Sequence, residues 1–225
     1  MAGWGVVGSE SSVRRQALRD PDVRLMLEVG EGSGKAFEEL VLRYQARLVM
    51  VLEHLVGNHD QAEDLAQEVF LRVYRARKSY LPGAKFSTWL FTIANNVASS
   101  ALRTKIRRRE VNLELQPSDT VGFRPLDAMA QAPSGQMPTR QFDKAEMRDI
   151  VQWALQTLNE RQRMAVLLNK FEGMSYADIA ETMGLSAKAI KSLLSRARLN
   201  LREVIAPYLD RGEHPNNVKS PLPPR

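Results

Sequence analysis

The chain has 225 residues, of which 44% are hydrophobic, and this is enough for two modest domains that each bury a core. It contains no cysteine, which excludes disulfides, thiolate metal sites and cysteine nucleophiles. Lys and Arg number 32 against 26 Asp and Glu, and the resulting formal charge of +6 favours a polyanionic partner.

Residues 1–34 are expected to form an N-terminal extension that is partly disordered. The stretch Met1 to Ser12 lacks the charged and apolar regions of a secretory signal, and no apolar run long enough to span a bilayer follows it. We therefore expect a cytoplasmic protein with no membrane insertion. The Gly-rich run from Gly30 to Lys35 lacks the spacing and the preceding strand of a phosphate-binding loop.

A first helical domain is predicted over residues 35–110, where apolar residues recur at helical spacing. One of its helices, residues 60–78, has an acidic and polar face opposite its apolar stripe. An acidic face repels DNA, so this one is either solvated or binds a basic partner protein. The residues alone favour the solvated face. The face comprises Asp60, Asp64, Gln67 and Glu68.

The next predicted helix, residues 86–103, has a stripe of small polar side chains that leads into a basic cluster. Such a stripe suits hydrogen bonds and phosphate contacts with nucleic acid. Trp89 lies at the border of this stripe, where a core position is favoured over a base-stacking platform. The polar stripe consists of Thr92, Asn96, Ser99 and Arg103, and the basic cluster continues with Lys105, Arg107, Arg108 and Arg109.

Residues 111–141 contain four prolines and little charge, which predicts a flexible linker that lets the domains dock at separate points. A second helical domain is predicted over residues 142–207, with Pro207 ending its last helix. The proline-rich tail, residues 208–225, is expected to be disordered.

The segment from Tyr176 to Leu194 has the pattern of a helix-turn-helix. Ile179 and Ile190 are apolar where two crossed helices bury side chains, and Gly184 supplies the positive φ of the tight turn. A plain helical hairpin is the less favoured interpretation. The second helix presents polar and basic side chains that suit a major groove. These are Ser186, Lys188, Lys191, Ser192, Ser195, Arg196 and Arg198. The predicted fold is therefore all-α, with two small helical domains joined by a flexible linker.

Taken together, these motifs resemble the bacterial RNA polymerase sigma factors of the extracytoplasmic-function (ECF) type, in the sigma-70 family. The resemblance covers about residues 37–109 and 143–202, in the right order around a linker. In the first domain it rests on Asp60, Ala62, Glu63, Asp64, Leu65, Gln67, Glu68, Val69, Phe70, Phe86, Thr88, Trp89, Leu90, Ile93, Ala94 and Asn96. In the second it rests on Leu158, Arg161, Gln162, Tyr176, Ile179, Ala180, Gly184, Leu185, Ile190, Lys191, Ser192, Ser195, Arg196, Ala197, Arg198 and Leu201.

The resemblance implies a transcription initiation factor without catalysis or cofactor, whose partners are core RNA polymerase and promoter DNA. Anti-sigma proteins are common partners in the family, although no residue here identifies one. The resemblance implies that the acidic face is a binding site for core polymerase and is not simply solvated. The residues of this expected site are Asp60, Glu63, Asp64, Gln67 and Glu68. The resemblance assigns the minus-ten element to Trp89, Thr92, Asn96, Ser99, Arg103, Lys105, Arg107 and Arg108, with the loop 79–87 holding the melted strand. It assigns the minus-thirty-five element to the seven side chains of the second helix.

Three positions depart from the family pattern: Ala189 replaces the usual threonine, Leu193 the usual arginine, and Ser100 a frequent acid. Two polar contacts of the recognition helix are therefore missing, so this helix reads an unusual sequence or relies more on DNA shape. The change at Ser100 has no explanation.

Two other classes of function account for less of the sequence. A helix-turn-helix regulator of the response-regulator output type predicts an independent operator-binding dimer, but no alternation of strands and helices precedes the linker. A nucleic-acid-processing enzyme lacks support because His54, His59 and His214 have no ligand spacing and the acidic cluster has no metal partners.

Overall fold

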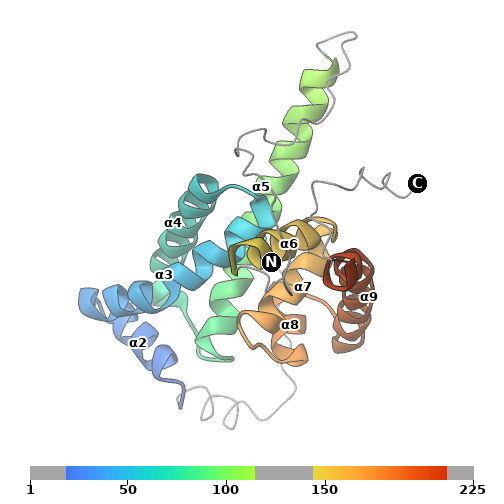
Figure 1. The fold of residues 1–225 in the computed structure, drawn as a ribbon. Coiled ribbons are helices and arrows are strands. Elements are labelled where there is room, and N and C mark those ends of the chain that lie inside the picture. The colour runs from blue at the N-terminus through green and yellow to red at the C-terminus, as the bar shows by residue number, and fades with distance from the viewer. Residues whose placement is uncertain (1–18, 115–143, 212–225) are drawn as a thin grey trace.

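The structure, a computed structural model, describes residues 19–114 and 144–211. Within these two ranges every regular element is a helix, which confirms the prediction of an all-α fold. Figure 1 shows the helices of the first domain on one side and those of the second on the other. The expected linker, residues 111–141, and the expected disordered tail, residues 208–225, both begin too early, because α5 continues to Glu114 and α9 to Arg211. The rest of these two segments, and residues 1–18, lie outside the described residues. None of the described helices is long and apolar enough to cross a membrane.

The first domain is built on the long helix α3 (Gly34–Val56), which packs against α4 (His59–Ala76) and α5 (Phe86–Glu114). Polar caps set the ends of α3: the hydroxyl of Ser33 accepts from Ala36 N–H at 3.2 Å, and Gly57 ends the helix at a φ of 74°. Asn58 then caps α4. The core of this domain includes Leu40, Leu48, Leu52, Val69, Val73, Phe86, Leu90 and Phe91.

Helix α2 (Pro21–Gly30) was not anticipated by the sequence analysis, which treated residues 1–34 as an extension outside the domain. Asp20 caps this helix and Pro21 occupies its first turn, where the missing N–H costs nothing. Val23, Met26 and Val29 are buried against the first domain. Helix α2 and its cap Asp20 therefore belong to the first domain, and a short 3-10 turn, η1 (Arg77–Ser79), packs on α2.

The second domain comprises α6 (Lys144–Gln156), α7 (Glu160–Lys170), α8 (Tyr176–Met183) and α9 (Ala187–Arg211). The expectation that Pro207 ends the last helix is wrong, because Pro207 lies inside α9. Proline removes one backbone hydrogen bond. The next residue, Tyr208, is 3% exposed and packs edge-on against Trp153 with ring centroids 5.6 Å apart. This aromatic contact fixes the last turns of α9 despite the proline.

The two domains pack against each other, with α5 beside α8 and α3 beside α7 (Figure 1). One continuous cluster of buried residues extends from Leu52 in α3 to Leu167 in α7 and Ile179 in α8. Composition and length predict that each domain buries its own core, and no pattern in the sequence predicts this contact. The distal part of α5 extends away from the packed body (Figure 1).

Candidate functional site

The helix-turn-helix is formed by α8 and α9, as the sequence predicts. Ser175 and Asp178 form a reciprocal capping box at the start of α8, and Gly184 ends that helix in the left-handed region with a φ of 63°. The hydroxyl of Ser186 accepts from Ala189 N–H at 3.2 Å and so starts α9. Ile179 and Ile190 are fully buried where the two helices cross. The turn therefore fixes α9 against α8.

The outward face of α9 is polar and basic, and no acid occurs between Lys188 and Arg202. Positions three and four apart on a helix share a face, so these side chains lie along one row. The exposed members are Lys188, Lys191, Ser192, Ser195, Arg196 and Arg198. One guanidinium is already oriented, because Nη2 of Arg198 donates to the Tyr176 hydroxyl at 2.8 Å. We call this row the α9 basic face.

The two unusual positions of α9 lie at the edge of the buried core. Leu193 is half-buried against the core cluster, and Ala189 is also partly covered. The apolar side chain of Leu193 therefore contributes to packing, and the α9 basic face has no donor at either position.

The polar stripe of α5 is only partly free. Thr92 donates its hydroxyl to the Thr88 carbonyl at 2.8 Å, which satisfies it within the helix. Asn96 is exposed, and Nε of Arg103 donates to the Ser99 carbonyl at 3.1 Å. The hydroxyl of Ser99 donates to Oε1 of Glu160, in the second domain, at 2.5 Å. Further along α5, Lys105 and Arg107 are exposed, whereas the side chain of Arg108 lies outside the described residues.

Trp89 belongs to an aromatic cluster at the start of α5. Its ring lies 4.8 Å from that of Tyr80 and 6.0 Å from that of Phe86, and it is half-buried. These contacts agree with the favoured interpretation of Trp89 as a packing residue. In the loop between η1 and α5, the apolar side chain of Leu81 is 85% exposed. Nothing in the sequence indicates this exposure.

The acidic face of α4 lies in solvent. Asp60, Glu63, Asp64 and Gln67 are exposed, and Glu68 is half-buried. Two of these acids have basic neighbours on the same helix: Glu68 accepts from Nε of Arg72 at 2.8 Å, and Glu63 lies 3.4 Å from His59. A hydrogen bond between His59 and Glu53 raises the pKa of His59. The carboxylates of Asp60 and Asp64 and the amide of Gln67 stay exposed, and a basic protein surface can contact them.

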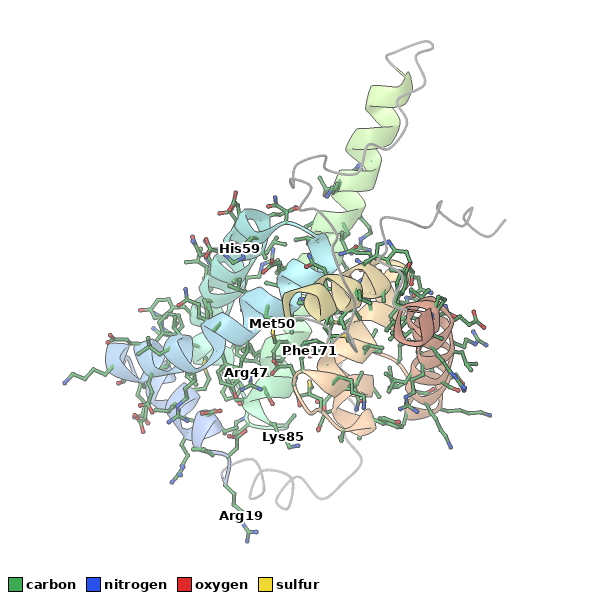
Figure 2. The ribbon with its side chains drawn as sticks, in the orientation of Figure 1. Arg19, Arg47, Met50, His59, Lys85 and Phe171 are labelled. Carbon is green, nitrogen blue, oxygen red and sulfur yellow. The ribbon has the colours of Figure 1, made fainter. Side chains whose placement is uncertain are left out.

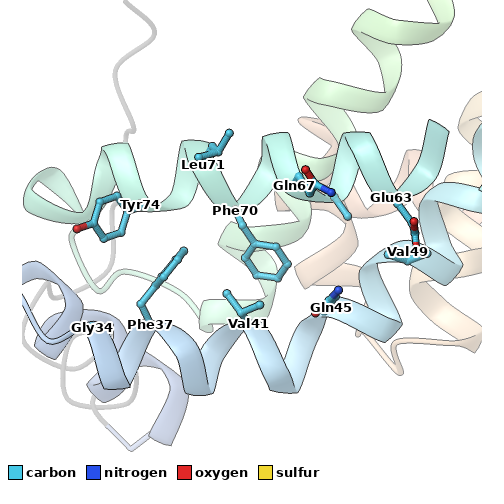
Figure 3. Close-up of a pocket in the computed structure, with 11 residues that line it drawn as sticks. Gly34, Phe37, Val41, Gln45, Val49, Glu63, Gln67, Phe70, Leu71 and Tyr74 are labelled. Atoms are coloured by element: carbon cyan, nitrogen blue, oxygen red, sulfur yellow. The ribbon is translucent and has the colours of Figure 1, made fainter. Parts of the chain in front are cut away.

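An apolar groove between α3 and α4 adjoins this acidic face, and the sequence analysis missed it. Figure 3 shows its two walls, with Phe37 and Val41 on α3 facing Phe70 and Tyr74 on α4. The groove has a volume of about 670 Å³, and Glu63 and Gln67 lie at its polar end. Leu71 and Tyr74 are 50% and 42% exposed. In the sequence, Leu71 and Tyr74 are large apolar residues three positions apart that lie outside the buried stripe of α4. This pattern could have indicated the groove.

Comparison with known proteins assigns the class. Residues 40–108 match the family described as "Sigma-70 region 2", and residues 148–201 match "Sigma-70, region 4". The chain belongs to the sigma-70 family of RNA polymerase sigma factors, which direct transcription initiation at promoters. Within that family, it falls in the ECF group, as its similarity to named ECF factors indicates.

Three relatives illustrate the similarity. The chain is 32% identical to the RNA polymerase sigma-H factor of Pseudomonas aeruginosa, over 85% of this chain and 97% of the relative. It is 32% identical to the ECF RNA polymerase sigma-E factor of Haemophilus influenzae, over 84% of this chain and 97% of the relative. Among solved structures, the sigma factor RpoE from Bartonella quintana, crystallised with the anti-sigma factor NepR, matches with a TM-score of 0.58 and 28% identity, over 79% of this chain and 99% of that one.

Proposed function

We propose that this chain binds core RNA polymerase through its first domain and reads promoter DNA with both domains. The minus-ten element contacts α5, and the minus-thirty-five element contacts α9. The observation that carries the proposal is the α9 basic face, an exposed row of cations on a correctly capped helix-turn-helix. Catalysis stays with the polymerase, and no cofactor is needed.

The α9 basic face suits a major groove. A recognition helix enters the groove with one face, and lysine, arginine and serine side chains reach phosphates and base edges from it. Lys191 and Arg196 are exposed and form no ion pair within residues 19–114 and 144–211, so they are available for phosphates. Arg198 is held by Tyr176, which reduces the entropy that it loses on binding.

The minus-ten role rests on the chemistry of α5 and its preceding loop. Asn96, Ser99 and Arg103 offer hydrogen bonds along one side of the helix, and the exposed side chains of Lys105 and Arg107 add positive charge further along it. Leu81, in the loop between η1 and α5, is an exposed apolar side chain that suits contact with an unstacked base. The melted non-template strand is the ligand that matches both features.

Core polymerase is the proposed partner of the acidic face and the adjacent groove. Carboxylates at Asp60, Asp64 and Glu63 repel DNA but attract a basic protein surface. The groove lined by Phe37, Phe70 and Leu71 offers apolar area next to these charges. Apolar contact surrounded by complementary charge is typical of specific protein interfaces.

We also propose a cytoplasmic site of action, because the polymerase and its DNA are there. The Bartonella sigma factor was crystallised with an anti-sigma factor, and a protein of that kind is proposed as a regulator of this chain.

The test compares DNA selection by the purified protein alone and with core polymerase. Both samples are incubated with a duplex pool of randomised sequence, and bound DNA is sequenced. The proposal expects two conserved elements at fixed spacing, selected only in the presence of the polymerase. Tight selection of a palindromic site by the protein alone supports instead an independent helix-turn-helix regulator.

A further inference from the structure

A polar cleft lies where the two domains meet. Lys85, just before α5, lies 3.1 Å from Asp178 in α8, and Figure 2 shows Lys85, Arg47 and Phe171 along the line of contact. Further along α5, the cleft has a volume of about 410 Å³, which is in the range of small-molecule sites. Its walls consist of Asn95, Asn96, Ser99 and Arg103 of α5, Glu160 and Arg161 of α7, and Met183, Gly184 and Leu185 at the turn between α8 and α9.

Hydrogen bonds between the domains hold the two walls of this cleft in place. Nη1 of Arg163, in α7, donates to the carbonyl of Leu55 at 3.1 Å, in the last turn of α3, where a helix leaves carbonyls unpaired. Inside the cleft, the Ser99 hydroxyl donates to Oε1 of Glu160 at 2.5 Å. The cleft is therefore already formed in the free protein, as sites for small ligands usually are.

One end of the cleft carries two cations. The bond from Ser99 to Glu160 places the start of α7, with Arg161, beside the turns of α5 that lead to Arg103. Both arginines are exposed, and neither forms an ion pair within residues 19–114 and 144–211. Together with the Glu160 carboxylate, they leave this end with a net positive charge. Guanidinium groups bind phosphate through paired hydrogen bonds, so this end suits a phosphate group.

The other end of the cleft combines an amide with apolar side chains. The Thr182 hydroxyl donates to the Thr88 carbonyl at 3.4 Å, which places the end of α8 beside the first turns of α5. Met183 and Leu185, both half-buried, therefore lie toward the end of the cleft that holds Asn95. An amide can hydrogen-bond the edge of a heterocyclic base, while thioether and aliphatic side chains pack on its face. This end therefore suits a nucleobase.

We propose that this cleft binds a nucleoside diphosphate. The phosphates lie between Arg103 and Arg161. The base lies beside Asn95, on the apolar surface of Met183 and Leu185. From Asn95 to Arg103 the helix rises by about 12 Å, a span that suits a base joined to a diphosphate through a sugar and exceeds that of a free phosphate ion. The inference goes beyond promoter binding and does not depend on it.

Calorimetric titration of the full chain with GDP tests the proposal, with guanosine and inorganic pyrophosphate as the comparison ligands. GDP joins the two halves of the proposed ligand, so it is expected to bind more tightly than either of them by about tenfold or more. The absence of GDP binding overturns the proposal. Equal affinities for GDP and pyrophosphate also overturn it, because they would mean that the cations attract any anion and that no base is recognised.

Single substitutions test the location of the bound nucleotide. Arg161→Gln is expected to weaken binding of both GDP and pyrophosphate by about tenfold, because a charged hydrogen bond to phosphate is lost. Asn95→Ala is expected to weaken binding of GDP and to leave that of pyrophosphate unchanged. Lys170→Gln is the matched control, since Lys170 is exposed on the same helix as Arg161 and does not line the cleft. Thermal unfolding shows that each variant is folded. If Arg161→Gln and Lys170→Gln bind GDP equally tightly, the nucleotide lies elsewhere and the proposal is wrong, whereas the proposed promoter function is unaffected.

Discussion

The carboxylate of Asp20 accepts a hydrogen bond from the backbone N–H of Phe86 at 3.1 Å, between residues 66 positions apart in the chain. Its other oxygen accepts from Asp22 N–H at 3.0 Å. One side chain therefore satisfies N–H groups at the starts of both α2 and α5, two places where a helix leaves such groups unpaired. This relationship ties the N-terminal helix to the start of the helix that carries the polar stripe.

Replacing Asp20 by alanine is expected to destabilise the protein by about 2 kcal/mol, because two helix starts each lose a cap of about 1 kcal/mol. Thermal or urea unfolding measures the loss. Asp20→Asn is the matched control: it offers a single carbonyl oxygen, so it keeps one cap and about half of the stability. Equal stability of Asp20→Ala and the wild type would show that the two bonds contribute nothing.

Gly30→Ala is expected to destabilise the contact between α2 and η1. A Cβ at Gly30 would lie 3.0 Å from the Arg77 carbonyl oxygen, a backbone atom. The resulting shift costs about 1–3 kcal/mol, partly offset by the better helix propensity of alanine, about 1 kcal/mol. Gly34→Ala is the control, since nothing lies within 4 Å of its Cβ. Unfolding curves in which both variants match the wild type would contradict the close approach.

The Lys85 to Asp178 contact predicts a pH dependence. Partial burial raises the pKa of Asp178, but hydrogen bonds from Ser175 and Lys85 and the Lys85 charge outweigh it, so the pKa is lowered overall. A carboxyl group whose pKa is lower in the folded than in the unfolded state stabilises the fold. This contribution is complete at pH values above the unfolded-state pKa, about 3.9, and is lost as the pH falls through the folded-state pKa.

Lys85→Gln is therefore expected to move the pKa of Asp178 upward, toward its ordinary value, in an NMR titration of the carboxyl group. The bond from Ser175 remains, so the shift is partial. Lys35→Gln serves as the control, because Lys35 is exposed at the start of α3 and contributes nothing to the pKa of Asp178. If Lys85→Gln leaves the titration unchanged, the interdomain pair is absent in solution.

Reversing charge on the acidic face tests the polymerase contact. Asp64→Lys combined with Glu68→Lys is expected to weaken binding to core polymerase by about tenfold or more, because it places cations opposite a basic surface. A quantitative pull-down measures this effect. Glu203→Lys, at an exposed acid of α9, is the control and should bind normally. Unimpaired binding of the double variant means that this face is solvated, as the residue pattern alone favours.

Removing cations from the α9 basic face should change the salt dependence of DNA binding. Lys191→Ala and Arg196→Ala are each expected to weaken binding across sequences and to reduce the slope of log K against log salt by about 1. Titrations of duplex DNA at several salt concentrations give the slope. Lys35→Ala is the comparison, and a slope that falls equally in that variant would point to general charge, with no contact by α9.

Local chemistry explains which parts of the fold were predictable. The helix-turn-helix was predictable because each of its signals is local: Gly184 allows the positive φ of the turn, Ser186 caps the second helix and Ile190 is apolar at the crossing. The structure confirms all three. Asp20 before Pro21 is a helix start signal, and the apolar residues 23, 26 and 29 have helical spacing. Helix α2 was nevertheless not predicted, because its stability comes from burial of these residues against distant helices.

Long-range packing explains the remaining differences. Pro207 predicts a helix end, but Trp153, more than fifty residues earlier, holds the next turn through Tyr208. The packing of the domains likewise depends on Arg163 reaching a carbonyl of α3, and a backbone acceptor leaves no pattern in the sequence. The acidic and basic faces were predictable as surfaces, whereas the covering of Ser99 by Glu160 was not.

The most direct measurement of the central claim is transcription in a reconstituted system. Core polymerase is incubated with a promoter library, with and without this protein, and the start sites of the RNA products are sequenced. The account predicts start sites that appear only with the protein and share two upstream elements, near minus ten and minus thirty-five. Identical sets of start sites in both reactions, with the protein shown to be folded, would contradict it.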